Sequence, residues 1–84
     1  MRFTVCWDES AEQDLAELFV DAVDRFEIRM AADWIDENLQ TRPDRIGHHV
    51  HEGLLGLERP PLKVLYSLSL KDRLVEVLRV ARTG

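Results

Sequence analysis

The sequence predicts an α+β protein of two layers, in which a helical hairpin packs on a mainly antiparallel sheet in the order β-α-α-β-β-β. Three observations support this. Apolar and polar residues alternate at the start of the chain, apolar residues recur at helical spacing between residues 10 and 41, and alternation returns after Pro43. Helices that precede a run of strands cover one face of the sheet. A chain of 84 residues is expected to form one domain, 1–84.

The first strand is predicted at residues 2–7, where Phe3, Val5 and Trp7 fall on one face. Cys6 lies within this segment, and we expect it to pack inside the strand. It is the only cysteine in the sequence, which excludes an internal disulfide and a CxxC metal or redox site.

The first helix is predicted at residues 10–23, because Ser10 and Gln13 have the spacing of a capping box. Its apolar residues recur at helical spacing: Ala11, Leu15, Leu18, Phe19 and Ala22. Asp24 and Glu27 give a second, weaker capping signal. A second apolar stripe follows and ends before Pro43, made of Ile28, Ala31, Ala32, Ile35 and Leu39. One unbroken helix over residues 10–41 remains an alternative.

The C-terminal half predicts a hairpin of strands. From residue 62, one face carries Leu62, Val64, Tyr66, Leu68 and Leu70, and we expect it to meet the helices. The last strand is apolar on both faces, which favours a central position in the sheet. Lys63, Arg79 and Arg82 are expected to share the opposite face, if the alternation holds across the pairing.

Charge restricts the classes of partner. The net charge of −5 argues against a general nucleic-acid binder, since such binding depends on Lys and Arg that neutralise phosphates. Residues 1–41 carry eleven acids and three bases, whereas residues 42–84 carry five acids and eight bases, so the two halves favour different partners. The N-terminus lacks the apolar segment of a signal peptide, and no run is long enough to span a bilayer. We therefore expect a soluble, cytoplasmic protein without a membrane partner.

Several segments together resemble the RelE/ParE superfamily of type II toxin–antitoxin toxins. They are "FTVCW", "AEQDLAEL", "AADWIDENL", "PPLKVLYSLS" and "RLVEVLRVAR", and they cover residues 2–82 in the order of that family. The resemblance implies a first strand beside the last strand. It also implies a growth-inhibiting toxin of a plasmid-stabilisation type of module, neutralised by a cognate antitoxin. We expect no metal and no cofactor.

The superfamily contains two kinds of toxin. RelE-like members cut messenger RNA on the ribosome, and ParE-like members inhibit DNA gyrase. Lys63 falls at the position of a RelE-like Arg, and Arg82 falls within a residue of a second one. The positions of the RelE-like lysines are instead apolar, at Leu54, Leu55 and Leu57, and Thr83 and Gly84 are expected to end the chain before a terminal Tyr. The ParE-like reading, with gyrase as a target, is therefore favoured.

Two alternatives stay open. A ribonuclease would use Lys63, Arg79, Arg82 and a histidine from residues 48–51, such as His49. An inactive relative would keep the fold as an interaction module. On the favoured reading the antitoxin or target binds a basic surface with an apolar centre, made of Arg59, Lys63, Leu65, Arg73, Arg79 and Arg82. A homodimer is compatible with all three readings.

Two further features have an ordinary and a functional interpretation. In "HHVH", His49 and His51 would lie on the same side of an extended segment and could share a metal, but no third ligand is evident. Polar residues that open a strand explain this segment better, and a histidine acting as general base is a third reading. Met30 and Trp34 lie beside the apolar stripe of the second helix. They either widen the core or, if exposed, mark a protein interface.

Overall fold

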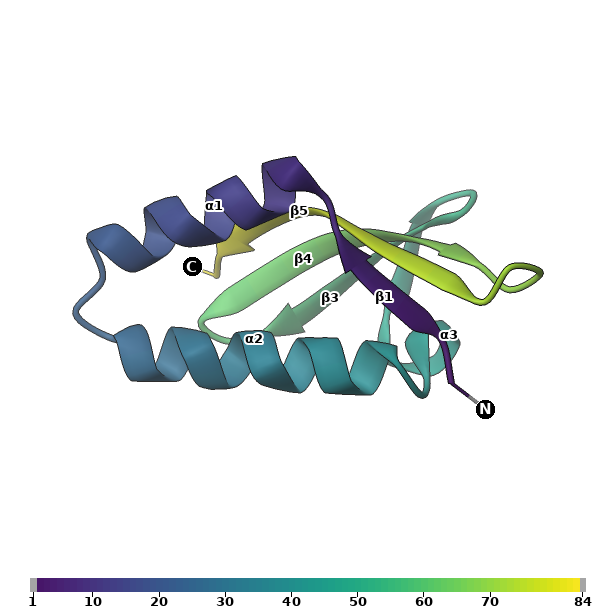
Figure 1. The fold of residues 1–84 in the computed structure, drawn as a ribbon, viewed down its shortest axis with the longest axis horizontal. Coiled ribbons are helices and arrows are strands. Elements are labelled where there is room, and N and C mark those ends of the chain that lie inside the picture. The colour runs from purple at the N-terminus through teal and green to yellow at the C-terminus, as the bar shows by residue number, and fades with distance from the viewer. Residues whose placement is uncertain (1, 84) are drawn as a thin grey trace.

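A computed structural model describes residues 2–83 as a five-stranded sheet with two long helices on one face (Figure 1). Gly84, the expected last residue, lies outside the described residues. The strand order is β1-β5-β4-β3-β2, and β1 runs parallel to β5 while the other pairs are antiparallel. The strands are β1 (Thr4–Trp7), β2 (His48–His51), β3 (Leu54–Arg59), β4 (Leu62–Ser69) and β5 (Leu74–Arg82). The predicted α+β class is confirmed, as is the placement of the first strand beside the last.

The sheet has one strand more than predicted, and a short helix precedes it. The turn-rich segment after Thr41 forms α3 (Pro43–Ile46) and then β2, whose four residues are all exposed. A strand at the edge of a sheet has one neighbour and no buried face here, so it lacks the apolar alternation by which strands are recognised.

The two long helices are separate, so the alternative of one unbroken helix is wrong. They are α1 (Glu9–Val20) and α2 (Arg25–Leu39). The end of α1 is fixed by Arg25, whose guanidinium donates to the carbonyl oxygens of Phe19 and Val20 at 3.0 and 2.9 Å. These are carbonyl groups that a helix end leaves without partners.

The cap of α1 lies two residues before the predicted one. Asp8 is extended, and its carboxylate accepts a hydrogen bond from the backbone N–H of Ser10 at 3.1 Å. An aspartate before the first turn serves as well as serine, and its charge is favourable at the positive end of the helix. Asp24 precedes α2, but its side chain makes no capping hydrogen bond.

The core lies between the helices and the sheet. From α2 it includes Ile28, Ala31, Ile35 and Leu39, as the helical spacing predicts. From β4 it includes Leu62, Val64 and Tyr66, as the alternation predicts. Tyr66 is fully buried, and its hydroxyl donates to the carbonyl oxygen of Pro43 at 2.6 Å. Burial and the negative charge of Asp44 raise the pKa of Tyr66 to about 12. Leu70, expected on the same face, lies beyond the end of β4 and is exposed.

Gly47 allows the close approach of Tyr66 to α3. A Cβ atom at Gly47 would lie 2.0 Å from the Tyr66 hydroxyl oxygen. The backbone at Gly47 is extended, with φ of −97°, so lack of space and not conformation requires glycine here.

Two predictions for single side chains have different outcomes. Cys6 is exposed, so its expected packing role is wrong; β1 turns Val5 and Trp7 toward the helices and Cys6 away from them. On α2, Trp34 packs against the core, whereas Met30 is 54% exposed. Trp34 therefore widens the core, whereas Met30 is exposed and fits the interpretation as part of a protein interface.

A β-bulge in β5 changes which side chains face the helices. Arg79 pairs with Leu65 and Val77 pairs with Tyr66, so Leu78 has no partner on β4. The extra residue shifts the alternation, and Val80 is buried together with Val75 and Val77. Beyond the bulge, Arg79 and Ala81 lie on the face of Lys63 and Leu65, and Arg82 pairs with Leu62 on the helix side. As predicted from its two apolar faces, β5 is not an edge strand and lies between β1 and β4.

The longest helix, α2, has 15 residues. Within residues 2–83, we find no helix with the length and apolar content needed for a membrane span.

Candidate functional site

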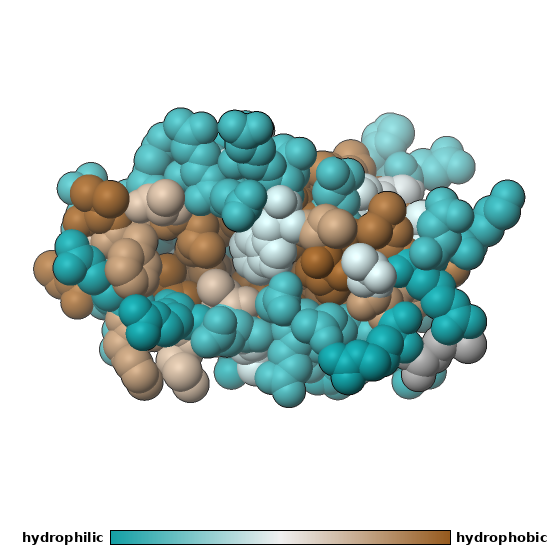
Figure 2. All heavy atoms as spheres, in the orientation of Figure 1, coloured by the Kyte–Doolittle hydropathy of each residue, from teal (hydrophilic) through white to brown (hydrophobic). Residues whose placement is uncertain are grey.

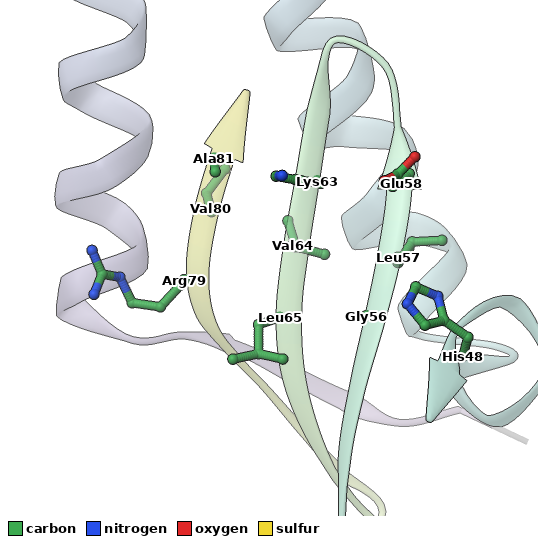
Figure 3. Close-up of a pocket in the computed structure, with 10 residues that line it drawn as sticks. All are labelled: His48, Gly56, Leu57, Glu58, Lys63, Val64, Leu65, Arg79, Val80 and Ala81. Atoms are coloured by element: carbon green, nitrogen blue, oxygen red, sulfur yellow. The ribbon is translucent and has the colours of Figure 1, made fainter. Parts of the chain in front are cut away.

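The sheet face away from α1 and α2 holds a hollow of about 220 Å³ that crosses strands β2 to β5, which we call the open-face pocket. Its rim carries His48, Glu58, Lys63, Leu65, Arg79 and Ala81 (Figure 3). On β3, β4 and β5 these residues lie next to side chains that are buried under the helices, because side chains alternate between the two faces. The strand β2 contributes His48, although all of its residues are exposed. The pocket therefore joins residues that are up to 33 positions apart in the sequence.

Among residues 2–83, Lys63 is the cation of the pocket that has no ionic partner. It is exposed on β4 between the buried residues Leu62 and Val64. The ion pairs among the described residues are Arg79–Asp14 and Arg82–Asp24, so no carboxylate lies within 4.0 Å of the Lys63 ammonium. Glu58 is directly opposite on β3 and lowers the net charge of the pocket without forming a contact ion pair.

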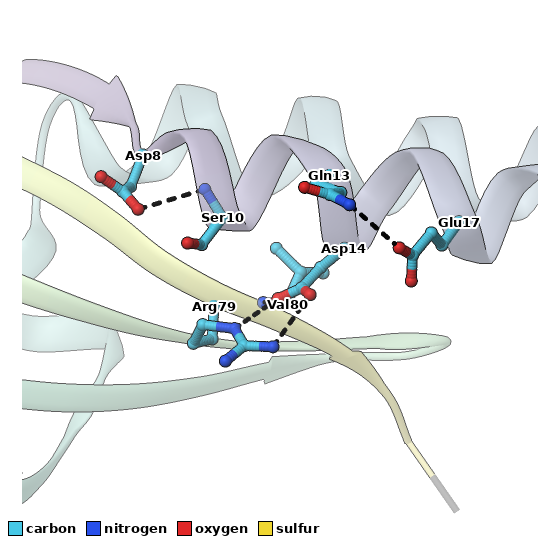
Figure 4. A network of polar contacts seen from close by, with 7 residues as sticks. All are labelled: Asp8, Ser10, Gln13, Asp14, Glu17, Arg79 and Val80. Carbon is cyan, nitrogen blue, oxygen red and sulfur yellow. Dashed lines mark hydrogen bonds and ion pairs between the residues drawn. The ribbon is translucent and has the colours of Figure 1, made fainter.

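Arg79 differs from Lys63, because α1 holds its guanidinium. The Nε and Nη2 atoms of Arg79 donate to the two carboxylate oxygens of Asp14 at 2.8 and 3.0 Å (Figure 4). The backbone N–H of Val80, next to the bulge, donates to the same carboxylate at 3.0 Å. Figure 3 shows the Arg79 side chain pointing toward α1 and away from Lys63. The positive charge of Arg79 at the pocket is therefore largely neutralised.

The pKa values of this pair reflect the contact. The hydrogen bond from Arg79, followed by the one from Val80, lowers the pKa of Asp14, and the pKa of Arg79 rises mainly through the same hydrogen bond. Asp14 is therefore ionised at neutral pH.

Arg82 and Arg59 do not lie on the open face, so the expected cationic surface is wrong in part. Arg82 donates to both carboxylate oxygens of Asp24, the residue before α2, at 2.9 and 3.0 Å. This hydrogen bond is the main cause that lowers the pKa of Asp24 and raises that of Arg82. The guanidinium carbon of Arg59 lies 4.5 Å from the ring centroid of Trp34 on α2, a cation–π distance.

Arg73 lies elsewhere again. It is in the turn between β4 and β5, with a φ of 52°, and its carbonyl oxygen accepts a hydrogen bond from Thr4. Of the six residues predicted for binding, the structure brings Lys63, Leu65 and Arg79 to one pocket and places Arg59, Arg73 and Arg82 outside it.

The histidine segment is divided by an irregularity in β2. His49 pairs with Leu55 and His51 pairs with Leu54, and these neighbouring residues of β3 point to opposite faces. The expectation that His49 and His51 share a side is therefore wrong. Over residues 2–83, no group of three His, Cys, Asp or Glu side chains is arranged to hold a metal ion.

Sequence reasoning did not single out His48, which lies at the pocket. A Cβ atom at Gly56 would lie 3.0 Å from two atoms of its imidazole, so the ring rests over the glycine. The available signal was Gly56 itself, because a glycine within a strand marks a place where another group approaches closely.

Comparison with known proteins gives a fold. The sequence matches no protein-family model and no curated protein. Solved structures do match over almost the whole chain. A chain of the toxin–antitoxin complex RelBE2 from Mycobacterium tuberculosis has a TM-score of 0.82 at 20% identity, with 99% of this chain and 100% of that chain covered. The isolated RelE toxin of E. coli has a TM-score of 0.67 at 14% identity, with 100% and 86% covered.

A toxin–antitoxin complex contains two kinds of chain, and the match to an isolated RelE toxin shows that this chain has the fold of the toxin. This chain has the RelE/ParE toxin fold. A chain of the chromosomal ParDE system of P. aeruginosa also matches, with a TM-score of 0.65 at 20% identity and coverage of 99% and 98%. The RelE/ParE fold thus includes structures from both branches, so the fold does not choose between their activities, and the residues of the open face must do so.

Proposed function

We propose that this chain is the toxin of a type II toxin–antitoxin module of the plasmid-stabilisation type, which inhibits growth by binding a protein and is neutralised by a cognate antitoxin. The whole chain, 1–84, acts as one toxin domain in the cytoplasm. The ParE-like reading makes DNA gyrase the candidate target.

The observation that supports protein binding is the charge of the open-face pocket. Lys63 is its single cation without an ionic partner among residues 2–83, because Asp14 holds Arg79, and Glu58 lies opposite Lys63. A site that cleaves RNA without a metal needs several free cations to stabilise the charge that develops at the phosphate. Leu65 and Ala81 between these charges instead offer apolar contact area, as the centre of a protein interface does.

The ribonuclease reading has one specific observation in its favour. His48, Lys63 and Arg79 line the same pocket, so a histidine is near two cations. Such a set could supply a general base and charge stabilisation if Arg79 left Asp14. Messenger RNA on the ribosome would then be the target.

Induced expression in bacteria separates these readings. We expect growth arrest with intact messenger RNA. We also expect DNA damage that disappears in cells whose gyrase carries a mutation that makes it resistant to the toxin. New RNA 5′ ends inside codons, lost in the His48→Ala variant, would establish the nuclease instead. Unchanged growth at a confirmed level of folded protein would contradict both toxin readings and leave the inactive interaction module.

The antitoxin should be encoded beside this chain. We expect a small adjacent reading frame whose product contains an acidic, amphipathic segment, since the pocket combines Lys63 with apolar residues. Co-expression of the two should restore growth, and a product that leaves growth arrested is not the antitoxin.

A further inference from the structure

Exposed apolar side chains gather where α1 joins α2. Val20, Val23, Phe26 and Met30 are 68%, 103%, 69% and 54% exposed, and we call these four residues the apolar knob. Phe26 and Met30 are one helical turn apart, on the side of α2 opposite to the buried residue Ile28. Together the four present on the order of 500 Å² of surface, the size of patch that is often functional in a monomer.

A second apolar feature lies directly beside the knob. A hollow of about 530 Å³ runs along α1, and its lining residues are Trp7, Glu12, Leu15, Ala16, Phe19 and Val20. We call it the apolar hollow. Val20 belongs to both features, so they are continuous. Figure 2 shows hydrophobic residues between two hydrophilic rims and at the end of the molecule where α1 and α2 connect.

We infer that a second copy of this chain docks here, with the knob of each copy in the hollow of the other. A two-fold interface must be self-complementary, because residue i contacts residue j and j contacts i. An apolar projection next to an apolar hollow on the same surface meets this requirement, since one rotation places both knobs in both hollows. The side chain of Phe26 is the central contact.

The buried area is sufficient for such a dimer. Two knobs alone remove on the order of 1,000 Å² from water, which is the lower limit for a specific interface. The walls of the two hollows add to this area. We therefore expect a dimer that dissociates on dilution.

The charges around the knob favour a second copy over a strongly charged partner. The flanking residues Asp21, Asp24, Arg25, Glu27 and Arg29 sum to −1, and the pair of Asp24 with Arg82 offsets this charge. Arg25 is already committed to the end of α1. Two identical surfaces can thus approach without local repulsion, although the net charge of −5 on each copy weakens the association.

Sedimentation of the purified chain from low to high micromolar concentration tests this inference. We expect a monomer–dimer equilibrium that Phe26→Asp weakens roughly tenfold or more, because a charge would enter the centre of the interface. Val50→Asp is the matched control: Val50 is 58% exposed on the edge strand β2, outside the knob and hollow, and the variant should dimerise as the original chain does.

A second variant tests the hollow without changing the knob. Ala16 is exposed on α1, and Ala16→Trp should fill the hollow and weaken the dimer to a similar degree, while the thermal unfolding midpoint stays the same. A monomer at every concentration would overturn the inference, as would a dimer that neither variant weakens. A monomer whose antitoxin binding is lost in Phe26→Asp would assign the surface to the antitoxin.

The inference goes beyond the proposed function and can fail separately. Growth arrest by a chain that is monomeric at all concentrations would overturn the dimer and leave the toxin reading intact. A dimer that causes no growth arrest would support the docking of two copies and contradict the toxin reading.

Discussion

The two faces of the sheet differ in whether their cations are paired with other side chains. On the helix side, Arg82 pairs with Asp24 and Arg59 stacks on Trp34, so each guanidinium holds a strand to the helical layer. On the open side, Lys63 has no ionic partner among residues 2–83. Arg79 begins on the open side, but its guanidinium reaches the edge of the sheet and pairs with α1.

This difference shows that the number of basic residues in a hairpin does not define a binding surface. Arg82 is directed to the helix side by a single extra residue, Leu78, in the bulge of β5. Cations on the helix side contribute to the structure, and so does Arg79 through its pair with Asp14, whereas Lys63 on the open side is available to a partner. The following variants test this division, from the largest expected effect to the smallest.

Gly47→Ala should be the most destabilising substitution. The new methyl group would displace the Tyr66 hydroxyl, which has no free space in the core, and we expect a loss of roughly 3 kcal/mol in unfolding free energy. Chemical denaturation measures this loss. Gly56→Ala is the matched control on the open side, where the group in the way is the exposed His48 ring, which can move. A loss as large for Gly56→Ala would show that the open side is as tightly packed as the core.

Tyr66→Phe removes a hydroxyl from the helix side and leaves the carbonyl oxygen of Pro43 without its partner. We expect a loss of about 1–2 kcal/mol with the fold intact, because a buried acceptor becomes unsatisfied. Denaturation of the variant should show a lower midpoint and an unchanged slope. An unchanged midpoint would mean that water replaces the hydroxyl.

Asp14→Ala should lower stability less than Tyr66→Phe, because the Arg79 side chain is 66% exposed and its pair is screened by solvent. The effect depends on pH. The pKa of Asp14 in the folded state is lowered from 3.8, so its contribution is present above that value and is lost as the pH falls through the lower folded pKa. The difference between the variant and the original chain should therefore shrink in acid. Ser10→Ala, about one turn earlier on α1, is the control, because it removes no titratable group and should show no such pH dependence.

Lys63→Ala should leave the unfolding free energy within about 0.5 kcal/mol, because the side chain is exposed and makes no ion pair among the described residues. Arg82→Ala should be the more destabilising of the two, since it leaves Asp24 without its partner. Equal midpoints in thermal unfolding would remove the distinction between the two faces for these residues.

Much of the fold could be predicted because its signals are local. The helical stripe of α2 and the alternation in β4 follow from side-chain periodicity, and Tyr66 was placed correctly by that alternation alone. The edge strand β2 was missed because it has no buried face. The cap of α1 was displaced because both Asp8 and Ser10 are suitable capping residues.

The site was predicted less well, because its geometry depends on contacts between distant residues. No local pattern marks the bulge at Leu78, which results from the pairing of β5 with β4 and from the carboxylate of Asp14 that accepts the Val80 N–H. Lys63 and Leu65 were identified correctly as residues of one face, since they lie on the regular part of β4. Among the histidines of residues 48–51, His48 could not be selected from the sequence, because its position over Gly56 depends on strand pairing.

The most direct test of the open face as a docking surface is the affinity of the antitoxin for three variants, measured by calorimetry with the product of the adjacent reading frame. We predict at least roughly tenfold weaker binding for Leu65→Asp and clearly weaker binding for Lys63→Ala, with Arg82→Ala close to the original chain. Unchanged affinity for Leu65→Asp and Lys63→Ala, together with a loss for Arg82→Ala, would place the interface on the helix side and contradict this account.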